Sequence, residues 1–326
     1  MKSKPTVIVT HQLPDEWLHT LHGRCHLIIG PPTTETSSLS NALWQLLPQA
    51  DGLLTMLTVK VDDTLLAQAP HLKVVSNMAV GVDNIDLDAC SRRGIPVGHT
   101  PGVLTAGTAD LGMALLLAAA RKIPQAAADA KAGKWTTWLP DGWLGVDLQE
   151  AVLGIVGLGQ IGTAVAERAA AFGMKLVYTS RTPKPETEAR LGITRLSLPQ
   201  LLAQSDFIML TTALTPETHH LINHETLAQM KPSAILINLA RGPIVDTRAL
   251  VTALQKGTIA AAALDVTDPE PLPASHPLYG LDNCLIVPHI GSATANIRQR
   301  MAELACQNVL AGLAGTPLPH CANLPR

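Results

Sequence analysis

Three glycines with a fixed spacing are the residues whose pattern most clearly indicates a chemistry. Gly157, Gly159 and Gly162 form G-x-G-x-x-G between the apolar run Val152–Val156 and a stretch that favours a helix. In this context the first glycine allows a tight turn, the second lets the backbone approach a pyrophosphate, and the third lets the helix press on the sheet. The free N–H groups and the positive end of the helix then face the phosphates. The stretch predicts a dinucleotide site; the alternative is a strand and helix whose glycines serve packing alone.

The second strand of this unit ends without the acidic residue that NAD-binding units usually place there. An Asp or Glu at that point binds the ribose 2′-hydroxyl of NAD. Here no carboxylate appears before Glu186, and hydroxyl and basic side chains follow the strand instead. Such a pocket suits the 2′-phosphate of NADP. The residues expected to meet this phosphate are Ser180, Arg181, Thr182 and Lys184. We expect NADP(H) to be preferred, with NAD(H) as the alternative if the two cations are ordinary surface residues.

The elements around these residues alternate between strands and helices along the whole chain of 326 residues, which is long enough for two domains. The expected strands are Thr6–Thr10, His26–Gly30, Gly52–Leu57, Leu72–Asn77, Pro96–His99, Val152–Val156, Leu176–Tyr178, Phe207–Thr211, Ala234–Asn238, Ala260–Leu264 and Cys284–Val287. The expected helices are Pro14–His22, Leu39–Leu47, Asp62–Ala69, Ile85–Arg93, Thr105–Arg121, Pro124–Lys131, Ile161–Phe172, Ser197–Gln204, Asn223–Met230, Thr247–Lys256 and Thr294–Leu313. This alternation predicts an α/β fold with two doubly wound parallel sheets, whose ligands lie at the carboxyl ends of the strands.

Composition argues against several classes of partner. A net charge of −2 without a basic stripe gives no reason to expect nucleic-acid binding. The longest apolar run, Met113–Ala120, is far too short to cross a bilayer, and Met1–Thr10 lacks the apolar region of a signal peptide. The five cysteines are scattered, and no His, Cys or carboxylate cluster has metal-ligand spacing. We therefore expect a cytoplasmic protein with reduced cysteines and no metal site.

Three further motifs give the chain a family resemblance. NLARG at 238–242, LDVTDPEP at 264–271 and PHIGSAT at 288–294, together with GLGQIG, resemble the D-isomer-specific 2-hydroxyacid dehydrogenases. Within that family the chain is most similar to the glyoxylate/hydroxypyruvate reductases, through WTTW at 135–138 and LTP at 214–216. The resemblance implies a Rossmann NAD(P)-binding domain at residues 100–288, inserted in a flavodoxin-like substrate-binding domain of residues 1–99 and 289–326.

The resemblance also implies an activity and its catalytic residues. Arg241 would hold the carboxylate and carbonyl oxygens of a 2-oxo acid, and His289 would act as general acid and base. Glu270 would hydrogen-bond the far ring nitrogen of His289. The implied reaction is NADPH-dependent reduction of glyoxylate to glycolate and of hydroxypyruvate to D-glycerate. Two alternatives stay open: another small 2-oxo acid such as pyruvate or 2-ketogluconate, or a coenzyme-sensing binding protein like the family's corepressors.

Further residues are expected at the substrate and the coenzyme. Val80 and Gly81 match a family loop whose backbone N–H groups hold the substrate carboxylate. Trp138 matches a tryptophan that reaches the partner subunit's active site, which implies a homodimer. Ser292 is expected either to contact substrate or to cap the last helix, and Asp265 to lie near the nicotinamide carboxamide. The other residues expected at the coenzyme are Gln160, Ile161, Ala213, Leu239 and Gly291.

Overall fold

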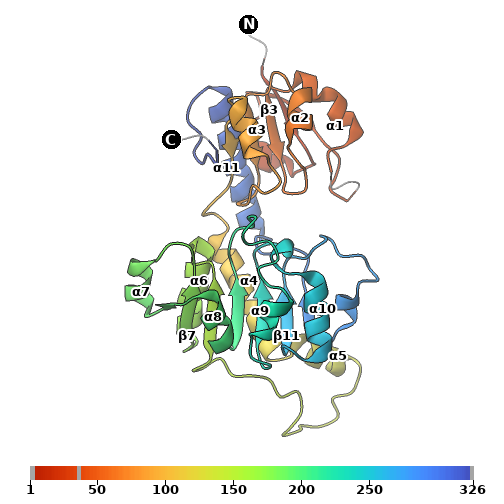
Figure 1. Ribbon diagram of the computed structural model, residues 1–326. Helices are drawn as coiled ribbons and strands as arrows, with labels where there is room; N and C mark the ends of the chain where they lie inside the picture. The colour runs from red at the N-terminus through yellow and green to blue at the C-terminus, as the bar shows by residue number, and fades with distance from the viewer. Residues whose placement is uncertain (1–3, 35–37, 324–326) are drawn as a thin grey trace. The chain divides into compact units, whose positions relative to one another are not determined.

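The computed structural model describes residues 4–34 and 38–323, and the chain forms two compact units (Figure 1). Unit 1 combines Met1–Leu104 with Thr294–Arg326, and unit 2 is Thr105–Ala293. The boundaries between the units lie a few residues after those expected for the two domains. Unit 2 is therefore continuous in sequence, whereas unit 1 is built from two separate segments.

Unit 1 is a five-stranded parallel sheet with helices on both faces. Its strands are β1 (Thr6–Val9), β2 (His26–Ile29), β3 (Gly52–Thr55), β4 (Val74–Asn77) and β5 (Val97–Gly98). They lie in the order β2-β1-β3-β4-β5, which is the flavodoxin-like order. One face carries α1 (Asn41–Leu46), α2 (Asp63–Gln68) and α3 (Leu87–Arg92), and α11 (Ala295–Leu313) packs on β3 and β4.

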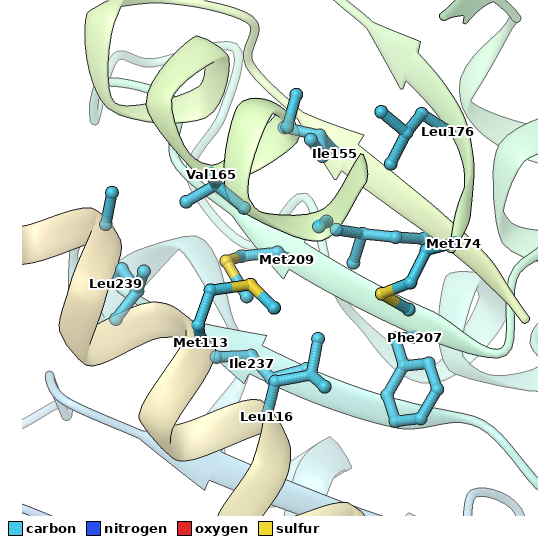
Figure 2. Packing of buried hydrophobic residues seen from close by; sticks show 14 of the residues in the cluster. Met113, Leu116, Ile155, Val165, Met174, Leu176, Phe207, Met209, Ile237 and Leu239 are labelled. Carbon is cyan, nitrogen blue, oxygen red and sulfur yellow. The ribbon is translucent and has the colours of Figure 1, made fainter. Parts of the chain in front are cut away.

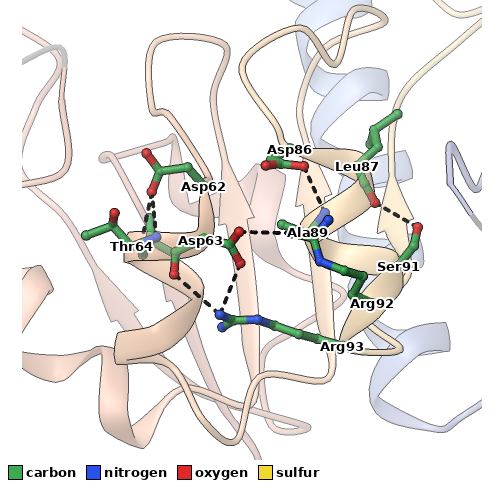
Figure 3. Close-up of polar contacts among 10 residues, drawn as sticks. Asp62, Asp63, Thr64, Asp86, Leu87, Ala89, Ser91, Arg92 and Arg93 are labelled. Atoms are coloured by element: carbon green, nitrogen blue, oxygen red, sulfur yellow. Dashed lines mark hydrogen bonds and ion pairs between the residues drawn. The ribbon is translucent and has the colours of Figure 1, made fainter.

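Aspartates fix the starts of two helices of unit 1 (Figure 3). Asp62 and Asp86 are the N-cap residues of α2 and α3, and their side chains accept hydrogen bonds from first-turn N–H groups. Each such cap typically contributes about 1 kcal/mol. Arg92, the last residue of α3, and the following Arg93 both bind the Asp63 carboxylate, at 2.9 and 3.2 Å, and join α3 to α2. These ion pairs are exposed and contribute less than the caps.

Unit 2 is a seven-stranded parallel sheet. Its strands are β6 (Val152–Val156), β7 (Lys175–Thr179), β8 (Thr194–Arg195), β9 (Phe207–Leu210), β10 (Ile235–Asn238), β11 (Ala261–Leu264) and β12 (Cys284–Ile286). Its helices are α4 (Thr105–Ala120), α5 (Ile123–Lys131), α6 (Gln160–Ala171), α7 (Pro185–Leu191), α8 (Leu198–Gln204), α9 (His224–Ala228) and α10 (Thr247–Lys256). The strand order β12-β11-β10-β9-β6-β7-β8 reverses between β6 and β9. This is the Rossmann arrangement with one added strand, and such a reversal is where α/β sheets bind ligands.

Alternate residues of each strand in unit 2 point to opposite faces of the sheet, and both faces are buried. On one face, Met113 and Leu116 of α4 and Val165 of α6 pack with Met209 and Ile237 of the strands (Figure 2). The other face packs against α8, α9 and α10. Burial on both sides explains why these strands read as continuous apolar runs in the sequence.

The structure confirms the predicted α/β fold with two parallel sheets and differs from the expected elements at two places. The helix expected at Pro14–His22 is only a short 3-10 turn, Asp15–Leu18. Helix α7 and strand β8 were not predicted. Within residues 4–34 and 38–323, no helix is both long enough and apolar enough to cross a bilayer.

Candidate functional site

The glycine motif forms a strand, a tight turn and a helix at the reversal point of the sheet in unit 2. Gly157, the residue after β6, has φ +99°, a backbone conformation that favours glycine. A β-carbon on Gly162 would lie 2.3 Å from the Gly157 carbonyl oxygen. Thr211, which follows β9, donates a hydrogen bond to that same oxygen at 2.6 Å. The turn, α6 and the end of β9 are therefore closely packed.

The surface above this turn is open. A β-carbon on Gly159 would meet no atom within 4 Å, and no side chain caps the start of α6. The first N–H groups of the helix, which include those of Gln160 and Ile161, can therefore donate hydrogen bonds to an anion. This arrangement fits a dinucleotide pyrophosphate. Ala213 is exposed in the loop after β9, whereas the Leu239 side chain is buried in the core against α4.

The segment after β7 carries the side chains expected at a 2′-phosphate. Ser180 donates a hydrogen bond to the Thr182 carbonyl at 2.6 Å, and the Lys184 N–H donates to the Tyr178 hydroxyl at 2.8 Å. Tyr178 in turn hydrogen-bonds Glu188 of α7. Burial, and then this bond, raise the pKa of Tyr178. Glu188 is therefore engaged by the tyrosine rather than presented beside the exposed Arg181, whereas Glu186, the other carboxylate of α7, is exposed.

Sequence reasoning missed a basic residue at this place. Arg195 lies on β8, beside β7, and its guanidinium donates hydrogen bonds to the Ser180 and Arg181 carbonyl oxygens at 2.9 and 3.1 Å. Strand β8 has two residues, both exposed, so no apolar pattern marks it. Only the pairing of β8 with β7 brings Arg195 to the end of the second strand.

The three charged residues implied by the resemblance follow three neighbouring strands of unit 2. Arg241 follows β10, Glu270 lies in the loop after β11, and His289 follows β12. The imidazole Nδ1 of His289 lies 2.6 Å from Glu270 Oε1. Because an ionised carboxylate only accepts hydrogen bonds, Nδ1–H is the donor and Nε2 is left for other partners. The pair has the geometry of an oriented general acid and base.

Asp265 fixes the backbone that carries His289. Its carboxylate is 2% exposed and accepts the N–H groups of Ile290 and Gly291, at 2.6 and 2.9 Å. Burial raises the pKa of Asp265, and these two donors partly oppose that rise. His289 has φ +52°, a left-handed conformation that costs a non-glycine residue about 1–2 kcal/mol. The contacts of Asp265 hold the chain in that conformation, a role the sequence did not indicate.

The loop that carries Arg241 is held against the loop that carries Glu270. Asn238 at the end of β10 donates to the Arg241 carbonyl at 2.9 Å, and the Arg241 side chain donates to the Ala240 carbonyl at 2.8 Å. A β-carbon on Gly242 would lie 1.9 Å from the Thr267 carbonyl oxygen, so the two loops are in direct contact. Packing of adjacent strand ends thus brings these two segments together.

The remaining expected residues lie in different parts of the structure. Val80 and Gly81 follow β4 in unit 1, where His99 Nδ1 lies 3.0 Å from the Val80 carbonyl oxygen and Asn77 donates to the Gly81 carbonyl at 2.9 Å. Ser292 is buried in unit 2 and does not cap α11, because the N-cap there is Thr294.

Trp138 lies on the segment between α5 and β6 and is 80% exposed. Across residues 4–34 and 38–323, no three His, Cys, Asp or Glu side chains are placed to share a metal ion.

The chain is similar in sequence to one family of dehydrogenases and to reductases within it. The model of the family "D-isomer specific 2-hydroxyacid dehydrogenase, NAD binding domain" matches residues 113–291. Glyoxylate/hydroxypyruvate reductase B of Yersinia enterocolitica is 45% identical over 323 residues, which cover 98% of each chain. Glyoxylate reductase of Thermococcus onnurineus is 43% identical over 98% of this chain and 96% of its own.

Solved structures show the same similarity. An NADPH-dependent glyoxylate/hydroxypyruvate reductase from Sinorhizobium meliloti, in complex with NADP and malonate, has a TM-score of 0.87 at 31% identity, over 99% of both chains. D-Lactate dehydrogenase from Aquifex aeolicus, complexed with NAD and lactic acid, has a TM-score of 0.88 at 29% identity, over 98% of this chain and 100% of its own.

Proposed function

The chain belongs to the D-isomer specific 2-hydroxyacid dehydrogenase family, and we propose that this NAD(P)-dependent oxidoreductase reduces glyoxylate to glycolate and hydroxypyruvate to D-glycerate with NADPH. The observation that carries the proposal is the His289–Glu270 pair at 2.6 Å, beside the strand end that carries Arg241. The names of the similar reductases supply the choice of 2-oxo acids.

Three side chains divide the work of the reduction. The coenzyme supplies a hydride for the carbonyl carbon of the 2-oxo acid. Arg241 binds the carboxylate and carbonyl oxygens of the substrate through its forked guanidinium. His289 gives the Nε2 proton to the carbonyl oxygen, which becomes the hydroxyl of the product, and takes it back in the oxidation direction. Glu270 holds the ring through Nδ1, and a general acid placed in this way contributes roughly 10²–10⁴-fold to the rate.

Two residues of unit 1 are proposed as substrate-binding from the family resemblance alone. The backbone N–H groups of Val80 and Gly81 bind the substrate carboxylate, and the contacts of His99 and Asn77 hold the carbonyl groups of this loop. Ser292 is buried and does not cap α11, and we propose that it contacts the substrate.

The preference for NADPH is supported by the side chains at the end of β7. The exposed Arg181 and the half-buried Ser180 and Lys184 follow this strand, and Glu188 is bound to a buried tyrosine. We expect a higher kcat/KM with NADPH than with NADH. A preference for NADH in this comparison would contradict the coenzyme assignment.

A second copy of the chain is the partner that the surface of unit 2 supports. Ile123, Trp138 and Leu144 lie between residues 123 and 146 and are 52%, 80% and 63% exposed. A cavity of about 500 Å³ beside this segment is lined by Leu144, Ala119 and Leu285 among others. Several large apolar side chains exposed within one short segment indicate an interaction surface. We therefore propose a homodimer in which this segment is covered and Trp138 reaches the partner's substrate.

Sedimentation of the protein tests the dimer. We expect the unsubstituted chain to sediment as a dimer and Leu144→Asp to shift it to monomer, because a charge cannot be buried unpaired in an apolar interface. Trp138→Ala should raise the KM for the 2-oxo acid. A monomer at micromolar concentration for the unsubstituted chain would contradict the proposal.

A panel of 2-oxo acids assayed with NADPH tests the activity itself. We expect the highest kcat/KM with glyoxylate and hydroxypyruvate, a loss of at least about 100-fold in His289→Ala, and nearly unchanged NADPH binding. His224→Ala, at an exposed histidine of α9, is the matched control. A higher kcat/KM with pyruvate or 2-ketogluconate than with glyoxylate and hydroxypyruvate would contradict the proposed substrates. No turnover on any acid, with NADPH still bound, would favour a coenzyme-sensing binding protein.

A further inference from the structure

Arg195 is a basic residue whose position depends entirely on an edge strand of unit 2. Strand β8 pairs in parallel with β7, and this register puts Arg195 opposite Tyr178, just before the segment that begins at Ser180. The side chain then crosses to that segment, where Nη2 donates to the carbonyl oxygens of Ser180 and Arg181 at 2.9 and 3.1 Å. One guanidinium nitrogen therefore holds two consecutive carbonyl groups after the second strand.

The other donors of Arg195 are not used by the protein. Within the described part of the chain, Nε and Nη1 of Arg195 make no hydrogen bond. Each of these free N–H donors of the guanidinium can give a charge-assisted hydrogen bond to a phosphate oxygen. It lies at the strand end where Rossmann units distinguish a 2′-hydroxyl from a 2′-phosphate.

The charges around this segment favour an anion. Arg181 and Lys184 follow the same strand. Glu188, the carboxylate that faces the segment from α7, is hydrogen-bonded by the Tyr178 hydroxyl and lies 3.4 Å from the Lys184 N–H. Glu217 lies in the loop after β9. A hydrogen bond with Thr215 is the main cause of the lowered pKa of Glu217, and the charge of Arg181 lowers this pKa further. Both of these carboxylates are thus engaged by other groups, and the exposed Glu186 at the start of α7 is one negative charge against the three cations Arg181, Lys184 and Arg195.

We propose that Arg195 is a specificity-determining residue for NADP(H), which fixes the Ser180–Arg181 carbonyl groups through Nη2 and offers one of its free N–H donors, together with its charge, to the 2′-phosphate of the coenzyme. The proposal rests on the NADPH preference proposed above. The two carbonyl oxygens would repel a phosphate if they faced it, and the guanidinium binds both of them. The same side chain therefore removes a repulsion and adds a charge-assisted contact, and neither effect acts on NADH.

Two substitutions of Arg195 separate these effects. Arg195→Gln removes the charge and keeps a neutral amide, whereas Arg195→Lys keeps the charge and removes the planar guanidinium. Arg190→Gln is the matched control, because Arg190 is an exposed arginine of α7 that pairs with Glu167 on α6. Thermal unfolding of each variant without coenzyme checks that the fold is retained.

Calorimetric titration measures the dissociation constants of NADPH, NADH, 2′,5′-ADP and AMP without turnover. For Arg195→Gln we expect roughly a tenfold to hundredfold rise for NADPH and 2′,5′-ADP, the range of a lost charged hydrogen bond. NADH and AMP should change by less than about twofold, which is well below the effect of a lost charged hydrogen bond. Arg195→Lys should recover part of the loss and Arg190→Gln should bind as the unsubstituted protein does. In steady state the KM for NADPH should rise in Arg195→Gln while kcat is kept.

The results that overturn the proposal differ from those that overturn the coenzyme preference. If the unsubstituted protein binds NADH as tightly as NADPH, the preference is wrong and the role of Arg195 falls with it. If the unsubstituted protein prefers NADPH and Arg195→Gln keeps that preference, only the role of Arg195 is wrong. Equal weakening of NADPH and NADH would show a merely structural role and would also overturn the proposal.

Discussion

Alanine at Gly162 should mainly destabilise the fold, whereas alanine at Gly159 should mainly weaken coenzyme binding. At Gly162 an added β-carbon would lie 2.3 Å from the Gly157 carbonyl oxygen and 2.9 Å from the Thr211 hydroxyl oxygen. Both atoms belong to packed backbone or to a hydrogen-bonded side chain, so the helix or the turn must shift. At Gly159 nothing lies within 4 Å, and the added methyl group points into open space.

The expected magnitudes follow from these distances. Overpacking a closed site costs about 1–3 kcal/mol, and alanine in place of glycine in a helix returns up to about 1 kcal/mol. We therefore expect Gly162→Ala to lower the free energy of unfolding of unit 2 by about 1–2 kcal/mol, or its Tm by roughly 2–8 °C. Gly159→Ala changes only the N-cap preference of α6, below about 1 kcal/mol.

The affinity for NADPH should fall more in Gly159→Ala than in Gly162→Ala. The methyl group of Gly159→Ala occupies the space in which the pyrophosphate approaches the backbone. A clash of about 1–3 kcal/mol raises the dissociation constant of NADPH by roughly 5- to 150-fold. Gly162→Ala weakens binding only through the displaced turn.

Thermal unfolding without coenzyme gives the Tm of each variant, and titration with NADPH gives its dissociation constant. The reasoning is refuted if Gly159→Ala binds NADPH normally, or if it destabilises the protein without coenzyme as much as Gly162→Ala does.

Two more substitutions test packing and charge elsewhere in unit 2. Burial alone would raise the pKa of Asp206, but hydrogen bonds from Lys231 and a backbone N–H lower it below its ordinary 3.8. The ionised carboxylate therefore stabilises the fold above pH 3.8, and this stabilisation is lost as the pH falls through the lowered pKa. Lys231→Met should cost about 1 kcal/mol at pH 7, with a Tm difference that narrows below about pH 4; a constant difference would contradict the account. Gly242→Ala forces a β-carbon to 1.9 Å from the Thr267 carbonyl oxygen, so kcat and Tm should both fall, whereas Gly280→Ala, with open space around it, should change neither.

The sheets of both units could be predicted because the signal for each strand is local. Strand β6 was expected at Val152–Val156 and is observed there, since an apolar run ends at a glycine turn. Helix α10 likewise spans the expected Thr247–Lys256, between an aspartate N-cap and Gly257. Strand order, by contrast, depends on pairings between distant segments, and the division of unit 1 into two segments came from the family resemblance.

The parts of the site that were missed depend on contacts that sequence spacing does not show. The hydrogen bonds of Asp265 join it to residues some 25 positions later, so its hold on the His289 backbone is a tertiary contact. Arg195 reaches Ser180 only because a two-residue edge strand pairs with β7. The assignment of His289, Glu270 and Arg241 came from the resemblance, and the structure supplies the 2.6 Å contact between the first two.

The return of the chain to unit 1 has a consequence for synthesis on the ribosome. Helix α11 buries Met301, Ala305 and Val309 and covers one side of β3 and β4, strands made more than two hundred residues earlier. The intervening unit 2 is continuous, so it has all its strands before α11 emerges. At ordinary elongation rates the sheet of unit 1 waits roughly 10–40 s with this face uncovered. We expect the apolar face of β3 and β4 to bind a chaperone during that interval, because exposed apolar surface otherwise favours aggregation.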